Sequence, residues 1–244
     1  MNNPDPSSCE DARLRRRFEG GLDELTGQCW WGRLYVRELR ALGKCLSQYP
    51  TLMKTDRALF KLAHYAIAGQ VMMIAARLVD THKDAASVYW LLNFVEQNTT
   101  IFPYPQNAVM TWVKADRQRL SELEEKIEKL TALRDKHYAH VDKDYLMQLD
   151  KLHAEYPFLP DDAEELYMAV GGILNRYSGR LRDSATYMET VLGEGHTAWL
   201  LDFLNKSLEA ANTHNRAELQ RLLDELYHVT EKGLEIRSLD RPQP

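Results

Sequence analysis

The chain has 244 residues and a formal net charge of −5, with 44% hydrophobic and 27% charged residues. This length allows a full hydrophobic core, and the composition is ordinary for a folded soluble protein. The negative balance argues against a protein that coats nucleic acid over its whole surface, although it leaves room for a local basic groove. The cysteines Cys9, Cys29 and Cys45 lack metal-ligand spacing, so we expect free thiols in a reducing compartment. With no signal-peptide core and no apolar run of about 18 residues, we expect a cytoplasmic protein without a membrane segment.

The sequence predicts an all-α fold, because no run alternates apolar and polar residues over the length of a strand. Ser7 and Glu10 form a capping-box start for a first short helix, which we expect Gly20 and Gly21 to end. Further helices are predicted, in chain order, over about 22–47, 56–80, 84–97, 107–139 or 107–141, 161–192, 196–211 and 216–235.

The breaks between these helices suggest three parts. Residues 1–21 form an N-terminal helix or arm, and residues 22–155 form a helical bundle. The proline-containing segment 156–160 is the clearest connection in the second half of the chain. We expect the helices of 161–240 to pack on the bundle, either within the same domain or as a separate one.

The most informative stretch lies near the end of the long central helix. An apolar seam at heptad-like spacing runs along this helix, formed by Leu120, Leu123, Ile127 and Leu130. The same count continues to Arg134 and His137. Because burying a cation without an anion is expensive, we expect these two residues to lie over a pocket, a groove or a subunit contact.

These residue types suit RNA cleavage without a metal ion. Histidine titrates near pH ~6.5, which fits transfer of the 2′-OH proton and protonation of the leaving 5′-oxygen. Arginine keeps its charge and matches the geometry of a phosphate. Along one helix Arg134 and His140 are about 9 Å apart in rise and about 120° apart in azimuth. Two copies facing each other would let them converge on one phosphate, whereas His137 lies one turn from Arg134 in the same chain.

The segment from Arg134 to His140 resembles the motif of HEPN-superfamily ribonucleases. That motif has an arginine, then a polar residue, here Asp135, and a histidine after about four to six intervening positions. The wider context, 76–80 upstream and 139–143 downstream, is similar to the abortive-infection branch called AbiU. The resemblance covers roughly residues 22–150 and can extend to the remainder of the chain.

The resemblance implies a HEPN-like helical bundle with additional C-terminal helices. It also implies a metal-independent endoribonuclease that needs no cofactor, acts as a homodimer on RNA, and leaves a 2′,3′-cyclic phosphate. Such proteins act in phage defence or as toxins, and an antitoxin, another regulatory protein or a nucleotide modification restrains them. The catalytic pair then corresponds to Arg134 and His140, with Asp135 as the orienting residue and His137 as an additional candidate.

Several interpretations compete with this one. The cluster from Arg134 to His140 can simply complement a helix dipole, or a HEPN-like scaffold can bind without cleaving. The alternative function is a non-catalytic all-helical protein that dimerises or docks a partner through the same seam. The remaining histidines form no His-Glu-x-x-His pattern, and no glycine-rich phosphate loop is present, so we predict neither a metal site nor a nucleotide hydrolase.

Two further groups of charged residues are best explained by structure. Arg77 and Asp80 lie one turn apart in an apolar helix, which favours a buried salt bridge that braces the bundle. The basic run of Arg176, Arg180 and Arg182 can hold an RNA backbone. A solvated face with Asp183 and Glu189 as neighbours is the preferred interpretation.

Overall fold

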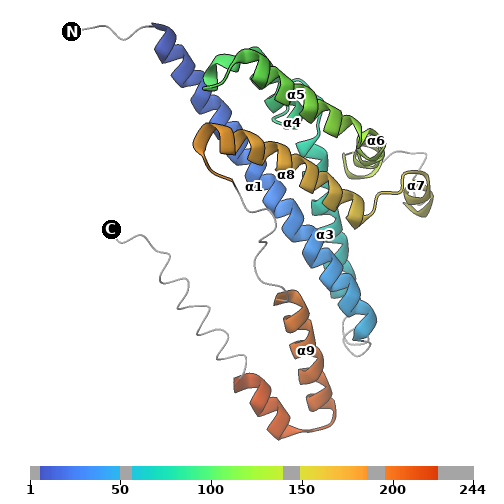
Figure 1. The fold of residues 1–244 in the computed structure, drawn as a ribbon. Helices are drawn as coiled ribbons and strands as arrows, with labels where there is room; N and C mark the ends of the chain where they lie inside the picture. The colour runs from blue at the N-terminus through green and yellow to red at the C-terminus, as the bar shows by residue number, and fades with distance from the viewer. Residues whose placement is uncertain (1–5, 50–56, 140–148, 186–195, 225–244) are drawn as a thin grey trace. The chain divides into compact units, whose positions relative to one another are not determined.

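A computed structural model describes residues 6–49, 57–139, 149–185 and 196–224, and every regular element in these ranges is helical. The predicted all-α class is therefore confirmed. The elements in chain order are α1 (Pro6–Gln48), α3 (Arg57–Leu78), α4 (Val88–Gln97), the 3-10 helix η1 (Thr99–Ile101), α5 (Gln106–Ser121), α6 (Glu124–Leu133), the π-helix η2 (Arg134–Ala139), α7 (Leu149–Glu155), α8 (Pro160–Arg182) and α9 (His196–Asn212) (Figure 1). Residues 216–224 are also helical.

Helix α1 runs without interruption from Pro6 to Gln48, so the predicted break at Gly20 and Gly21 is wrong. A glycine inside a helix costs only about 0.5–1 kcal/mol relative to alanine, and burial of neighbouring side chains such as Phe18 and Leu22 outweighs this. Gly21 has a tertiary reason for being glycine. The ring of Trp90 on α4 occupies the space that a β-carbon at Gly21 would need.

Two other predicted boundaries also shift. Helix α4 begins at Val88 and not near Asp84, because the Ser87 hydroxyl caps it by accepting a hydrogen bond from the Trp90 amide at 3.3 Å. The predicted central helix is divided at residues 122–123, where the Leu123 amide donates to the Leu120 carbonyl, three residues back. Its last turn is the π-helix η2.

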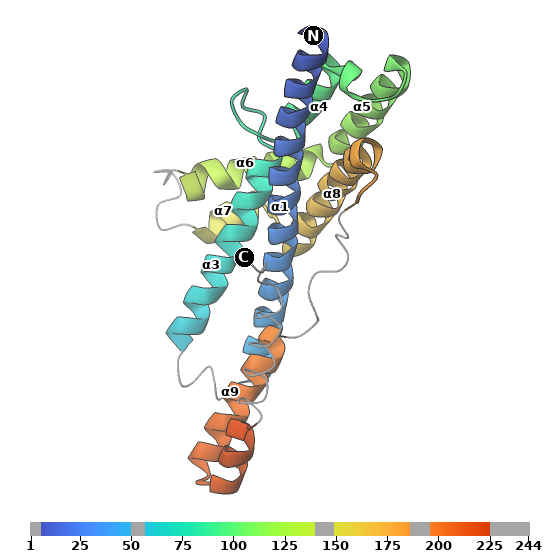
Figure 2. The ribbon, with the colours of Figure 1, turned by 90° about the vertical axis from the view of Figure 1, so that its left-hand side faces the viewer.

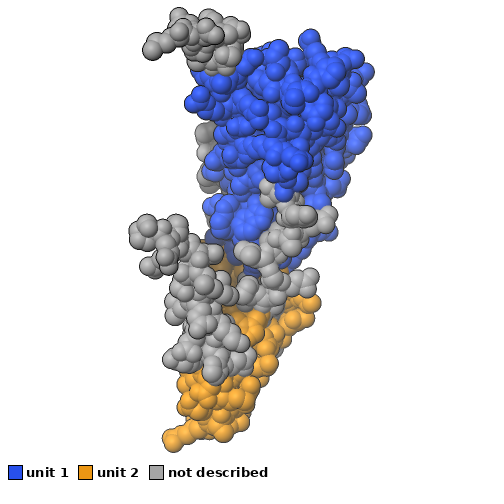
Figure 3. Space-filling model, turned by 60° about the vertical axis from the view of Figure 1, so that its left-hand side comes forward, with its two compact units in different colours: residues 1–40, 65–192 blue, residues 41–64, 193–244 orange. Residues whose placement is uncertain are grey.

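The chain forms two compact units (Figure 3). Unit 1 comprises residues 1–40 and 65–192, and unit 2 comprises residues 41–64 and 193–244. Helices α1 and α3 each contribute to both units, and α4 to α8 belong to unit 1. The division predicted from the sequence, at 22, 155 and 161, stays a prediction.

Tyr167 of α8 joins three helices in the core of unit 1, where α1, α3 and α8 lie side by side (Figures 1 and 2). Its hydroxyl donates to the Val71 carbonyl of α3 at 2.7 Å, and its ring fills the space beside Gly32 of α1. The Cys29 thiol of α1 donates to the Tyr167 carbonyl at 3.1 Å. Burial raises the pKa of Cys29 to about 12, so this free thiol is a packing residue and not a nucleophile.

Helix α3 has two dissimilar halves. Its residues 58–78, with a mean hydropathy of 1.3, are long and apolar enough to cross a membrane by length and composition, a test that core helices of soluble proteins also pass. Val71 and Leu78 are buried in unit 1, as a core helix requires. Leu59 and Leu62, in the first half of the helix, are 56% and 67% exposed. The cytoplasmic location stays a prediction.

Candidate functional site

The apolar seam of the central helix positions the candidate site. The seam residues Leu120, Leu123, Ile127 and Leu130 are all buried in the core of unit 1, as predicted. Leu133, also buried, ends α6, and Arg134 follows it as the first residue of η2. A π-helix is rare and is often found at functional sites, because the wider turn redirects the side chains that it carries.

Arg134 is held by two carboxylates from different parts of the chain. Its Nε donates to Asp135 Oδ1 at 2.7 Å, and its Nη1 donates to Asp80 Oδ2 at 3.0 Å. Asp80 lies just after α3, so the second bond ties the end of that helix to the start of η2. The cation expected over the seam is therefore neutralised by anions, and its side chain keeps 22% of its surface exposed. The hydrogen bond to Asp135 raises the pKa of Arg134, and Asp80 raises it further.

Asp80 does not form the predicted salt bridge with Arg77. Its carboxylate accepts from Arg134 and, through Oδ1, from the His82 amide at 2.9 Å, which fixes its orientation. Arg77 is exposed and has no ion pair with any described residue. The resemblance to the AbiU branch included residues 76–80 but did not indicate that Asp80 contacts Arg134. The sequence feature that could have indicated an ion pair here was an acidic residue directly after an apolar helix.

The predicted site residues are described to different extents. Asp135 contacts Arg134 and has a side chain that is 52% exposed. The backbone of His137 lies in η2, while its side chain is outside the described part of the structure. His140 lies outside the described residues altogether. The structure thus brings Arg134 and Asp135 together, adds Asp80, and leaves both histidines as predictions.

The basic run of α8 has structural partners that the sequence did not indicate. Arg176 Nη1 lies 2.9 Å from Asp116 Oδ1 on α5, the Arg180 guanidinium lies 3.7 Å from the centroid of the Trp112 ring, and Arg182 pairs with Asp23 of α1. The preferred neighbours Asp183 and Glu189 are not these partners, and Glu189 lies outside the described residues. These arginines brace α8 against α1 and α5.

Asp116 is the buried acid of that second cluster, with none of its surface exposed. Neither of its oxygens has a well-directed hydrogen-bond donor, so its contact with Arg176 is an ion pair at short range. Burial raises the pKa of Asp116, while Arg176 and Tyr177 oppose that rise.

No group of three or more histidine, cysteine or acidic side chains within the described ranges is arranged to hold a metal ion. The described side chains of the candidate site are a guanidinium and two carboxylates. An arginine in this setting binds and stabilises an anion, and a separate group must transfer protons.

Comparison with known proteins identifies the family. No curated protein and no solved structure matches the chain. The family model described as AbiU2, of the HEPN type, matches residues 16–198. This range includes Asp80, Arg134 and Asp135, as well as α8 with its three arginines. The matched range extends beyond the 22–150 that the motif suggested. The chain therefore belongs to the AbiU2 family of HEPN proteins.

Proposed function

We propose that this protein is a metal-independent endoribonuclease that acts in phage defence or as the toxin of a toxin–antitoxin pair. The observation that carries the proposal is the position of Arg134. It occupies the arginine position of a HEPN-type motif, at the first residue of a π-helix, with a side chain tied to Asp80 and still partly open to solvent. Restraint by a partner protein and cleavage by a homodimer belong to the same proposal.

Arg134 would stabilise the charge that develops on phosphorus. Its Nε and Nη1 are engaged by carboxylates, and no described residue accepts from Nη2. That nitrogen can donate to a phosphate oxygen while Asp80 fixes the guanidinium plane. Preorganisation of this kind reduces the reorganisation needed when the pentacoordinate phosphorane forms.

Asp80 and Asp135 would then have different tasks. Asp80 is half as exposed as Asp135, at 26% against 52%, and is fixed by the His82 amide. It therefore acts as the permanent anchor. Asp135 holds the guanidinium when no RNA is bound, and an incoming phosphate replaces it, because both anions compete for the same donors.

Proton transfer is assigned to His140, with His137 as the second candidate. A histidine base removes the proton from the ribose 2′-OH, whose oxygen attacks the adjacent phosphorus. A histidine acid gives a proton to the leaving 5′-oxygen. The products are a 2′,3′-cyclic phosphate and a 5′-OH end, and no metal ion or water enters this step.

The experiment that tests the proposal uses purified full-length protein, total RNA and EDTA. We expect fragments with 2′,3′-cyclic phosphate ends, and we expect Arg134→Ala and His140→Ala each to reduce their yield strongly. Arg16→Ala serves as the control, since Arg16 is an exposed arginine on α1. Cleavage retained by both site variants would overturn the mechanism.

The balance of charge around Arg134 favours one alternative. Arg134 is already paired with two carboxylates, Asp80 and Asp135. An arginine with a purely structural role would make the same ion pairs. A non-catalytic protein that dimerises or docks a partner through this seam would have the same contacts. In that case Arg134→Ala changes the sedimentation behaviour or the stability of the protein, and wild-type protein leaves RNA intact.

A further inference from the structure

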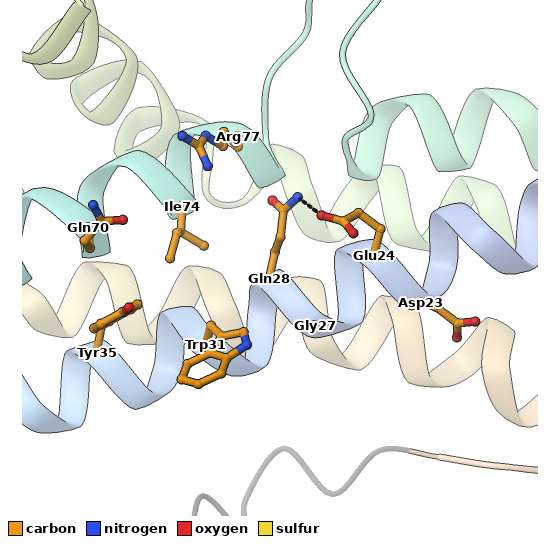
Figure 4. Close-up of a pocket in the computed structure, with 9 residues that line it drawn as sticks. All are labelled: Asp23, Glu24, Gly27, Gln28, Trp31, Tyr35, Gln70, Ile74 and Arg77. Atoms are coloured by element: carbon orange, nitrogen blue, oxygen red, sulfur yellow. Dashed lines mark hydrogen bonds between the residues drawn. The ribbon is translucent and has the colours of Figure 1, made fainter.

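Unit 1 has a pocket between α1 and α3 whose lining does not include Asp80, Arg134 or Asp135. Its volume is about 470 Å³, within the usual range of about 300–1,000 Å³ for small-molecule sites. Trp31 and Tyr35 line it from α1, and Gln70 and Arg77 line it from α3 (Figure 4). Trp31 is 52% exposed, although a tryptophan of a folded chain is normally well covered.

Gln28 supplies an unused acceptor at this pocket. Its amide nitrogen donates to Glu24 Oε1 at 2.9 Å. Because an ionised carboxylate only accepts, this bond fixes the amide with its oxygen on the other side. That oxygen is buried and has no hydrogen-bond partner. Figure 4 shows Gln28 reaching from α1 toward the end of α3 that carries Arg77. A buried acceptor without a partner favours a ligand that brings an N–H group.

Arg77 supplies an unused cation at the same pocket. It is exposed, and among the described residues it has no ion pair. It lies one turn before Asp80, whose carboxylate is bonded to Arg134. The pocket is therefore connected to the proposed cleavage site through the last residues of α3 and the turn that follows them. Of the two acids on the opposite lining, Asp23 is paired with Arg182 and Glu24 accepts from the Gln28 amide.

We infer that this pocket binds one nucleotide unit of a single-stranded RNA, next to the phosphate that is cut. Trp31 stacks on the base, the Gln28 carbonyl accepts from a base N–H group, and Arg77 binds the adjoining phosphate. Every base has a flat face and at least one N–H group, so stacking with one acceptor suits RNA of mixed sequence. The assignment of this nucleotide as part of a substrate rests on the proposed function.

The test measures binding of a fluorescently labelled single-stranded oligonucleotide with 2′-O-methyl riboses. This probe has no 2′-OH, so it cannot be cleaved by the proposed route, and binding is read independently of catalysis. We expect Trp31→Ala to weaken binding by about tenfold, the effect of losing one stacked base, and Trp31→Phe to keep most of the affinity.

Arg77→Gln should change the salt dependence as well as the affinity. Loss of one phosphate contact makes the slope of log affinity against log salt concentration shallower by about 0.7 for a single strand. Trp31→Ala should leave that slope unchanged, because stacking releases no counterions. Arg16→Gln removes the same charge from an exposed site on α1 outside the pocket, and should leave both quantities at the wild-type values. Unchanged thermal midpoints would show that the variants are folded.

The outcomes separate this inference from the proposed function. Wild-type protein that cleaves RNA, with oligonucleotide binding unaffected by Trp31→Ala and Arg77→Gln, overturns the pocket assignment and leaves the nuclease standing. Binding that depends on both residues, in a protein that cleaves no RNA, supports the pocket as an RNA site and overturns the nuclease. Displacement of the oligonucleotide by a free mononucleotide of equal affinity would overturn the assignment to an RNA strand.

Discussion

Two of the arginine–carboxylate clusters in unit 1 differ in which partner is in excess. Between α5 and α8, one fully buried carboxylate, Asp116, faces Arg176, and Arg119 and Arg180 are close enough to lower its pKa. At the start of η2, one cation, Arg134, is shared by Asp80 and Asp135, and all three side chains are partly exposed.

The difference indicates two kinds of task. A buried acid surrounded by cations cannot exchange its partner without breaking the helix contact, so its interactions contribute to the stability of the fold. A partly exposed cation with two anions can exchange one of them for a ligand and keep the other. If stability and activity divide between the clusters in this way, substitutions at Arg134 should change activity, and substitutions at Asp116 should change stability.

The largest effect is expected from Arg134→Ala. Loss of a donor that stabilises a developing oxyanion typically lowers the rate by about 10²–10³, so RNA cleavage should fall by that factor. Arg134→Lys should recover only part of the rate, because lysine lacks the planar pair of donors. Initial rates on a labelled RNA measure both variants. The free energy of unfolding should stay close to wild type, since the side chain is partly exposed. A strongly destabilised Arg134→Ala variant would contradict the division.

Asp116→Ala should show the opposite pattern. Removing this buried acid takes away the ion-pair partner of Arg176 and leaves a cavity between α5 and α8, which we expect to cost about 2 kcal/mol of unfolding free energy. Denaturant titration measures this. Glu125→Ala is the matched control, because Glu125 is an exposed acid paired with Lys129 at i, i+4, and an exposed pair of this kind contributes little to stability. Cleavage per folded molecule should not change in either variant.

Features that depend on residues close together in the sequence could be predicted, whereas contacts between residues far apart in the sequence could not. The helical class and the buried seam from Leu120 to Leu130 depend on local periodicity, which one chain displays directly. The motif at Arg134 could also be found, because its residues lie close together in the sequence.

Partners distant in the chain could not be predicted. Local spacing paired Arg77 with Asp80 within one turn, whereas Asp80 bonds Arg134, 54 positions later. The same holds for Gly21, whose reason for being glycine is the ring of Trp90. Local rules treated it as a helix break, and only tertiary packing reveals the close approach.

Asp80→Asn compares the two anions of Arg134. Loss of the charged hydrogen bond that anchors the guanidinium should lower cleavage about tenfold, equivalent to about 1.4 kcal/mol. Asp135→Asn should lower it less, because Asp135 is the partner that a phosphate replaces. Rates at saturating RNA, with KM measured separately, distinguish the two. An equal loss of rate in both variants would show that the anions are interchangeable.

The smallest expected effect is on the pH dependence of stability, and it is seen by comparing wild type with Asp116→Asn. Burial gives Asp116 a higher pKa in the folded protein than its ordinary value of 3.8, so the folded state binds this proton more tightly than the unfolded state. Its contribution to stability is therefore fully present below pH 3.8 and decreases as the pH rises through the folded pKa. The amide of Asp116→Asn does not titrate. The stability advantage of wild type over Asp116→Asn should accordingly decrease between about pH 3 and pH 7, as measured by denaturant titration at each pH. An advantage that grows with pH would mean that Arg176 outweighs burial, and that the Asp116 carboxylate belongs with the ion pairs that strengthen as they ionise.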